Sequence, residues 1–203
     1  MSSKPQTPDR AEIGKLVAAD RQRRRLILGL ARSLADKGRA ELTVADVVSA
    51  AGVSRRTFYE HFSNLREAVL VSHRATADAV RKVLARECGT GSWEEQVRAG
   101  LARLLELAAA EPDLATLLVL DSFNFDRNTM AELLRTRGEL ATMLRGGRRE
   151  DGPPEITEEF LVGAVAAVIA ARLRAGRAQQ LPELHEPLLE LIFARYRGLT
   201  AAR

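Results

Sequence analysis

The segment over residues 47–62 restricts the fold of this chain more than any other part of the sequence. It reads VVSAAGVSRRTFYEHF, with Gly52 between two short stretches of helical composition. Two short helices joined by a tight turn that contains glycine form a helix-turn-helix. Phe58 and Phe62 are four residues apart and therefore share one face of the second helix. We expect these rings to pack with Val47 and Val53 in a small core that fixes the angle between the helices.

The second helix of this motif then turns its polar residues wholly or partly outward. These residues are Arg55, Arg56, Thr57, Tyr59 and Glu60. A recognition helix needs this arrangement, because residues near its N-terminus reach base edges in the major groove. The guanidinium groups of Arg55 and Arg56 fit the O6 and N7 atoms of guanine, whereas Tyr59 and His61 suit phosphate. The alternative is a small helical hairpin with solvated arginines, and the motif alone leaves it open.

The rest of the chain shows helical periodicity, and no segment alternates apolar and polar residues as a strand does. Caps, spacing and breakers predict helices over residues 20–38, 43–51, 54–62, 63–87, 92–110, 113–124, 127–144, 157–176 and 183–199. We therefore expect an all-α fold. Its parts are a flexible N-terminal tail over residues 1–19, a three-helix helix-turn-helix head over 20–66, and a helical body over 67–203.

Charge is unevenly distributed along the chain. Residues 1–66 hold 13 Lys and Arg against 7 Asp and Glu, which leaves 18 and 20 of the totals of 31 and 27 for the remainder. A basic N-terminal part on a mildly acidic body suggests a polyanionic partner, although chance asymmetry would give the same counts. The single cysteine, Cys88, allows no intramolecular disulfide, which fits a reducing cytoplasm. The apolar stretch at 161–171 is shorter than the roughly 20 residues that span a bilayer, so we expect no membrane association.

Residues 23–70 resemble the N-terminal domain of the TetR family of bacterial transcriptional regulators. The run TVADVVSAAGVSRRTFYEHF carries the resemblance, together with the basic helix before it and the long helix after it. The resemblance implies a DNA-binding head and a body that binds a ligand and dimerises. We expect a repressor that binds a double-stranded operator in the cytoplasm, associated with the nucleoid, although these residues leave activation open as the alternative. Two-fold symmetry would place the heads on half-sites about 34–36 Å apart, or a multiple of that distance.

The resemblance also assigns DNA contacts to individual residues. Thr43 would bind a phosphate at the start of the second helix, and Tyr59 and His61 would hold the backbone. Family members often carry a lysine three residues after the position of Phe62, where this chain has Leu65 followed by Arg66. The predicted DNA-binding residues are Thr43, Ser54, Arg55, Arg56, Thr57, Tyr59, His61 and Arg66. The basic cluster Arg21, Arg23, Arg24 and Arg25 either contacts DNA as an arm or is a solvated helical turn.

The helix predicted near residues 160–173 is apolar on nearly every side. Such a helix must be covered all round, by its own core on one side and by another helix on the alanine-rich side. Together with the last helix it predicts a two-fold homodimer. The predicted interface residues are Phe160, Ala164, Val168, Ala171, Leu188 and Ile192. The alternative is a helix buried entirely within a monomer.

The middle helices are the expected place for an apolar small-molecule effector. The predicted lining residues are Trp93, Leu117, Asp121, Phe123, Phe125, Met130 and Leu134, although most residues at such spacings belong to an ordinary core. We expect no enzyme, metal or cofactor, because the three histidines lie far apart and no phosphate loop or HExxH pair occurs. A helical protein-interaction module that uses the same hairpin is the remaining alternative.

Overall fold

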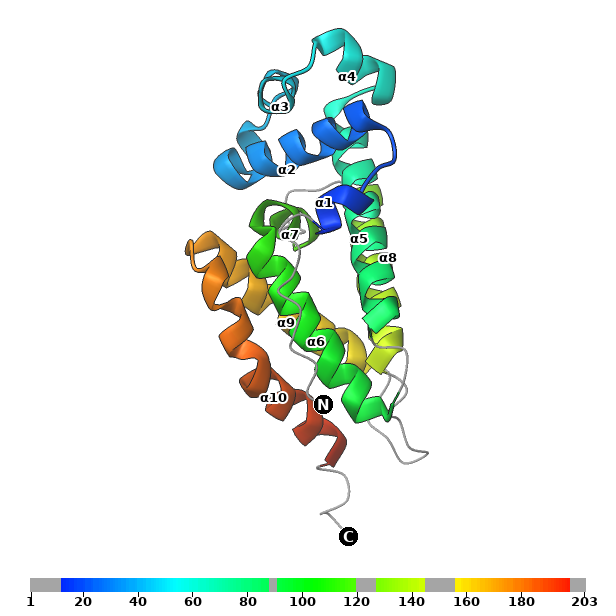
Figure 1. The fold of residues 1–203 in the computed structure, drawn as a ribbon, viewed down its shortest axis with the longest axis vertical. Helices are drawn as coiled ribbons and strands as arrows, with labels where there is room; N and C mark the ends of the chain where they lie inside the picture. The colour runs from blue at the N-terminus through cyan, green and yellow to red at the C-terminus, as the bar shows by residue number, and fades with distance from the viewer. Residues whose placement is uncertain (1–11, 88–90, 120–126, 145–155, 198–203) are drawn as a thin grey trace, which may run out of the picture.

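The computed structural model describes residues 12–87, 91–119, 127–144 and 156–197, and every regular element in these ranges is a helix. The all-α prediction is therefore confirmed. Figure 1 shows an elongated molecule with the N-terminal helix-turn-helix part at one end and the helices of the body below it. The elements are α1 (Glu12–Leu16), α2 (Arg21–Glu41), α3 (Val44–Ala51), α4 (Arg55–His61), α5 (Leu65–Glu87), α6 (Trp93–Ala110), α7 (Pro112–Leu118), α8 (Arg127–Leu144), α9 (Ile156–Arg174), the 3-10 helix η3 (Ala178–Leu184) and α10 (His185–Arg197).

Local sequence signals set the helix ends of the head, which comprises α2, α3 and α4. Asp20 caps α2, because its Oδ1 accepts a hydrogen bond of 2.7 Å from the backbone N–H of Arg23. Thr43 and Asp46 form a reciprocal capping box at the start of α3. Gly52 ends α3 with a φ of 60°, a left-handed conformation that glycine adopts without strain. These caps confirm the predicted starts of the helices.

The core of the head is built around two aromatic rings from α4 and its C-terminal end. Phe58 and Phe62 are both buried, with ring centroids 5.6 Å apart. They belong to one apolar cluster with Val47 of α3 and with Leu26 and other residues of α2. The predicted aromatic core between the two helices of the motif is thus confirmed.

The body comprises α5 to α10, and its core is continuous with that of the head. The cluster that contains Phe58 extends to Val83 and Leu84 on α5 and to Leu114 and Leu117 on α7. A second cluster joins α6, α9, η3 and α10. Helix α5 therefore carries the apolar core from the head into the body without a linker (Figure 1). No helix within the described ranges is long and apolar enough to cross a membrane.

A flexible tail was predicted over residues 1–19. This prediction is wrong for residues 12–19, and residues 1–11 lie outside the described residues. Residues 12–16 form α1, and Ile13 and Val17 are buried in the cluster of the head. Two causes explain the difference. Ile13, Leu16 and Val17 have the spacing of one apolar helical face. In addition, N–H groups in the first turn of α1 donate to the side chain of Glu111, the residue that precedes α7.

Three other boundaries differ from the predictions. Helix α2 was expected to stop at Gly38, but after a kink there, with φ 73°, the helix resumes and runs to Glu41. Helix α7 ends at Leu118, and the remainder of the predicted helix over 113–124 lies largely outside the described residues. The final predicted helix begins as the 3-10 turn η3 before α10.

Gly29 of α2 packs directly against Ala51 at the end of α3. A Cβ atom there would lie 2.7 Å from the backbone nitrogen of Ala51 and 2.9 Å from its Cβ. Because backbone atoms cannot move aside as a side chain can, Gly29→Ala should destabilise the protein by about 1–3 kcal/mol in urea unfolding. Gly138→Ala in α8 is the matched control, since its Cβ would meet nothing within 4 Å and alanine favours a helix. Equal free energies of unfolding for the two variants would contradict this packing.

Candidate nucleic-acid interface and ligand cavity

Helix α4 lies at one end of the molecule, where its N-terminal turn faces solvent (Figure 1). Ser54 caps this helix, because its Oγ accepts a hydrogen bond of 3.0 Å from the N–H of Thr57. The hydroxyl groups of Ser54 and Thr57 also lie 3.0 Å apart and share a hydrogen bond. The cap positions Arg55 and Arg56 as the first two residues of the helix, and both are exposed.

The outer face of α4 combines cationic and aromatic groups over the buried ring of Phe58. The Arg56 side chain is 89% exposed and its Nε donates to Glu60 Oε1 at 3.0 Å. An exposed ion pair of this kind contributes little stability, so an incoming anion can replace Glu60. Tyr59 is 57% exposed and packs its edge against Phe58 at a centroid distance of 5.3 Å. The outer face of α4 therefore offers hydrogen-bond donors to an anion, and binding of the anion leaves the packing of Phe58 undisturbed.

The remaining predicted DNA contacts lie around this face in different settings. Thr43 is exposed, but its Oγ1 donates to Asp46 Oδ2 at 2.7 Å, so a phosphate would compete with Asp46 for this hydroxyl. His61 ends α4, is half-buried, and its Nε2 lies 3.7 Å from Asp20 Oδ1. Arg66 is exposed in the first turn of α5.

Three of the arginines at the start of α2 make contacts within the protein. The guanidinium carbon of Arg23 lies 5.8 Å from the centre of the Phe62 ring, a cation–π geometry. Arg25 donates to the carbonyl of Gly52 at 2.6 Å and so ties α2 to the turn of the motif. Arg24 donates to the backbone carbonyls between α1 and α2. These contacts favour a positioning role over a free arm.

The ion pair between Lys37 and Asp46 shifts the pKa values of both residues. Lys37 Nζ lies 2.7 Å from Asp46 Oδ1. The hydrogen bond from Lys37, followed by those from the hydroxyl and N–H of Thr43, lowers the pKa of Asp46 to about 2. The same hydrogen bond raises the pKa of Lys37. The pair joins the C-terminal part of α2 to the first turn of α3 and so stabilises the position of α3 relative to α2.

The body contains a cavity of about 350 Å³ among α5, α6, α7, α8 and α9. Its lining is mostly leucine, valine, isoleucine and alanine. It extends along α5 from His73 to Ala85 and along α6 from Gln96 to Glu111, which at the helical rise is a length of about 20 Å. The cavity is therefore elongated along α5 and α6.

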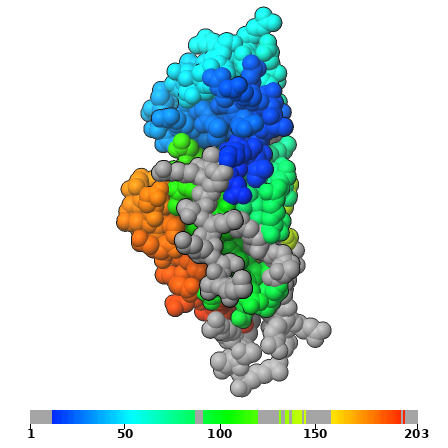
Figure 2. Space-filling view, in the orientation of Figure 1, coloured from blue at the N-terminus to red at the C-terminus, as the bar shows by residue number. Residues whose placement is uncertain are grey.

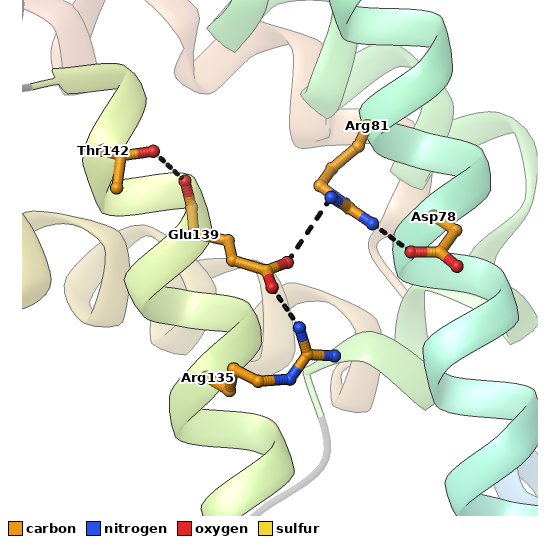
Figure 3. A network of polar contacts seen from close by, with 5 residues as sticks. All are labelled: Asp78, Arg81, Arg135, Glu139 and Thr142. Carbon is orange, nitrogen blue, oxygen red and sulfur yellow. Dashed lines mark hydrogen bonds and ion pairs between the residues drawn. The ribbon is translucent and has the colours of Figure 1, made fainter.

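Polar groups lie toward both ends of this cavity. His73, Thr76 and Glu111 lie in the half nearer the head, and Arg81 and Gln96 in the far half. Figure 3 shows how Arg81 is held: it bonds Asp78 on α5 and lies 3.6 Å from Glu139 on α8. Glu139 also pairs with Arg135, and Thr142 Oγ1 donates to its backbone carbonyl at 2.6 Å. This network joins α5 to α8 at one side of the cavity.

The predicted pocket residues that the structure describes do not line this cavity. Trp93 packs against Phe193 and Tyr196 and donates from Nε1 to the carbonyl of Leu144 at 3.1 Å. Leu117 is buried in the core of the head and Leu134 is 57% exposed. Asp121, Phe123 and Phe125 lie outside the described residues, as does the side chain of Met130.

The cavity residues that the sequence reasoning missed had a recognisable signal. His73 and Thr76 are polar residues on the face of α5 that otherwise carries Val80, Val83 and Leu84. Polar residues within an apolar helical stripe indicate either a satisfied core or a ligand site, and here both residues line the cavity.

The predicted dimer residues fall into two groups. Phe160 is 71% exposed, and Ala164 and Ala171 are exposed on the same side of α9, whereas Val168 is partly buried. Leu188 and Ile192 are buried within the protomer, where Ile192 also lines the cavity. The exposed apolar residues among those described in α10 are instead Pro187, Leu191 and Ala194, with Leu191 66% exposed. The prediction is therefore wrong for Leu188 and Ile192, whose side chains lie in the core of their own chain.

Residues 26–69 match the family described as bacterial regulatory proteins, tetR family. This segment contains α3, α4, most of α2 and the start of α5, so the match falls on the head. A comparison with curated proteins found no match.

Solved structures share the fold over nearly the whole chain. The fatty acid degradation regulator FadR from Bacillus halodurans is 18% identical, with a TM-score of 0.73 over 92% of this chain and 98% of that one. FadR from Bacillus subtilis, solved in complex with stearoyl-CoA, is 16% identical, with a TM-score of 0.68 over 83% and 96% of the two chains. A TetR-family regulator from Streptomyces coelicolor is 16% identical, with a TM-score of 0.66 over 90% and 92%.

Replacing Lys37 with methionine should raise the pKa of Asp46 from about 2 toward its usual 3.8, because the strongest hydrogen bond to the carboxylate is lost. An NMR titration of the carboxyl carbon measures this change, and Lys82→Met on α5 should leave it unaltered. Since the pKa is lower in the folded state, the pairing stabilises the head above about pH 4, and that stabilisation is lost as the pH falls toward 2. An Asp46 pKa that is the same in both variants would show that Lys37 does not hold the carboxylate.

Proposed function

Because the chain is a TetR-family protein with the fold of DNA-binding transcriptional regulators, we propose that it represses transcription as a homodimer on a pseudo-palindromic operator. A small-molecule effector in the body releases it from DNA, and its place of action is the nucleoid of the cytoplasm. The observation that carries the proposal is the geometry of α4, whose buried Phe58 fixes an outer face with Arg55, Arg56 and Tyr59 exposed.

In this proposal the first turn of α4 enters the major groove. Arg55 reads a base edge directly, and Arg56 does so after exchanging Glu60 for a nucleobase acceptor. Tyr59 and His61 contact phosphates from the same helix, and Thr43 and Arg66 contact phosphates from the starts of α3 and α5. The Ser54 and Thr57 hydroxyls, which bond each other in the free head, lie beside the base edges.

Arg55→Ala should relax base preference at one position of each half-site and weaken specific binding by about 1–3 kcal/mol. Arg86→Ala, at the exposed far end of α5, removes the same charge away from α4 and should leave affinity unchanged. Selection of bound fragments from a random DNA pool, followed by titration of the selected operator, measures both effects.

Salt dependence separates this function from that of a protein-interaction module. Operator affinity should fall with salt with a log–log slope of about 0.9 per phosphate neutralised. If the wild-type protein selects no DNA sequence, or if the Arg55 and Arg86 variants bind alike, α4 is not a recognition helix.

The dimer proposal is supported by an exposed apolar stripe. Phe160, Ala164, Ala167 and Ala171 recur at helical spacing along α9, and all four are exposed. The small side chains of the three alanines allow a second helix to approach closely. Leu191 on α10 adds a second large exposed side chain to the apolar surface. We propose that the same α9 and α10 surfaces of two copies pack against each other about a two-fold axis.

Leu191→Glu should convert the dimer to a monomer of 22.3 kDa, because the new carboxylate would be buried in the interface. Leu134→Glu is the matched control, since Leu134 is a similarly exposed leucine on α8 outside the proposed interface. Sedimentation equilibrium measures the mass, and the monomeric variant should also lose operator affinity. A wild-type protein that sediments at 22.3 kDa at micromolar concentration would refute the dimer.

The length and the apolar lining of the cavity support an effector with an extended apolar chain. The lining residues extend over about 20 Å of α5 and α6, and most of them are aliphatic, which suits such a chain. The FadR protein from Bacillus subtilis, which shares this fold, was solved with stearoyl-CoA. We therefore propose a long-chain amphiphile, whose polar group lies near Arg81. Effector and operator must then weaken each other by the same factor.

A further inference from the structure

Helix α1 lies outside the segment that matches the family, and Glu111 fixes it against the body. Glu111 Oε1 accepts a hydrogen bond of 2.7 Å from the N–H of Ile13, and Oε2 accepts one of 2.9 Å from the N–H of Gly14. These are two of the N–H groups at a helix start that have no partner within the helix. A carboxylate that receives both makes strong, charge-assisted hydrogen bonds.

Two further features support this contact. Arg103 of α6, which is buried, pairs with Glu12 of α1 and lies 3.3 Å from Glu106. Gly14 leaves the space that the Glu111 carboxylate occupies, because a Cβ there would lie only 3.0 Å from Oε2. Helix α1 is therefore held by both a carboxylate and a cation of the body, and Figure 2 shows it (dark blue) at the surface between head and body.

The same contact forms the end of the cavity that is nearer the head. Ile13 and Glu111 both line the cavity, and Ile13 is buried. Glu111 also separates α6 from α7, since its N–H donates to the carbonyl of Leu107 and its carbonyl accepts from Ala115. An apolar chain that fills the cavity to this end therefore meets the Ile13 side chain directly beside the Glu111 carboxylate.

From α1, a short series of contacts leads to the recognition helix. Arg24 of α2 donates to the carbonyl of Ala18 at 3.2 Å in the segment that joins α1 to α2. Asp20 then caps α2, and its Oδ1 lies 3.7 Å from Nε2 of His61, the last residue of α4. A displacement of α1 thus acts on residues that position both α2 and α4.

From these contacts we infer that Ile13 senses the length of a chain bound in the cavity, as a length gauge, and that Glu111 holds α1 in place until Ile13 is displaced, as a latch. An unbranched chain long enough to displace Ile13 breaks the two hydrogen bonds to Glu111, releases α1 and lowers operator affinity. A shorter chain binds without releasing α1. The inference rests on the proposed function, and it assigns the coupling to α1 rather than to the body helices alone.

The test uses full-length protein and octanoate, laurate and palmitate as probes. Hydrogen exchange is followed at the amides of Ile13 and Gly14, and operator affinity by fluorescence anisotropy. Palmitate should accelerate exchange at these two amides and lower operator affinity at least about fivefold, the lower end of typical allosteric coupling, whereas octanoate should do neither. Glu111→Gln should accelerate the same exchange and lower operator affinity without any fatty acid.

Glu95→Gln is the matched control, because Glu95 accepts from the N–H of Ser92 at 2.8 Å at the opposite end of α6. It should leave exchange in α1 and operator affinity unchanged. Ile13→Val, which removes one methyl group and preserves the helix, should shift the shortest releasing chain to a greater length. This variant keeps the gauge testable if Glu111→Gln folds poorly.

The outcomes separate the latch from the proposed function. Fast exchange in Glu111→Gln with unchanged operator affinity overturns the inference, as does palmitate binding by calorimetry without faster exchange at Ile13 and Gly14. Failure of every fatty acid to bind overturns the length gauge. A wild-type protein that selects no DNA sequence overturns the proposed function, and the exchange measurements then still report on the latch.

Discussion

Burial of the Phe58 ring is the interaction on which the outer face of α4 depends. The helix has only seven residues, far fewer than a helix needs to be stable alone in water. Its orientation must therefore come from packing, and the fully buried Phe58, with Phe62 beside it, provides the apolar contact to α2 and α3. Truncation of a buried phenylalanine commonly costs about 3–5 kcal/mol, which exceeds any effect of capping or propensity in so short a helix. The exposed positions of Arg55 and Tyr59 follow from this ring.

The head is not an independent unit attached by a tether. Its apolar cluster continues through α5 and α7, so a shift in the body is transmitted by packed side chains. Charged residues of α2 and α7 also interact where these helices lie near each other. Burial raises the pKa of Asp113 on α7. The charge of Asp36 on α2 adds to that rise, and the charge of Arg32 on α2 opposes it. Glu111 immediately precedes this segment and holds α1. Three connections between head and body, through α5, α7 and α1, therefore converge on the end of the cavity nearer the head.

Features encoded within a few residues could be predicted from the sequence, and those set by distant contacts could not. Asp20, Thr43, Ser54 and Ser92 cap the helices they were expected to cap, because a cap depends on a residue and its neighbours three positions on. Helix α1 was missed because the acceptor that completes it, Glu111, is 98 residues away from Ile13. For the last helix, the spacing of three residues predicts Leu188 and Leu191 on one face, but the packed structure buries Leu188 and leaves Leu191 66% exposed. The cavity is lined by residues of α1, α5, α6, α7, α8, α9 and α10, and no local pattern contains it.

Helix α9 is apolar on nearly every side, and its two sides face different surroundings. Leu161, Val165 and Ile169 line the cavity from one side of the helix, while Phe160, Ala164, Ala167 and Ala171 are exposed on the other. In the proposed dimer, effector and partner subunit would thus be separated by a single helix, whose diameter with side chains is about 10–12 Å. Because packed interiors resist compression, an effector that moves α9 would also move the surface on which the two heads are spaced. The cavity would then act on the operator complex by two routes: α1 sets the orientation of α4, and α9 sets the distance between the two copies of it.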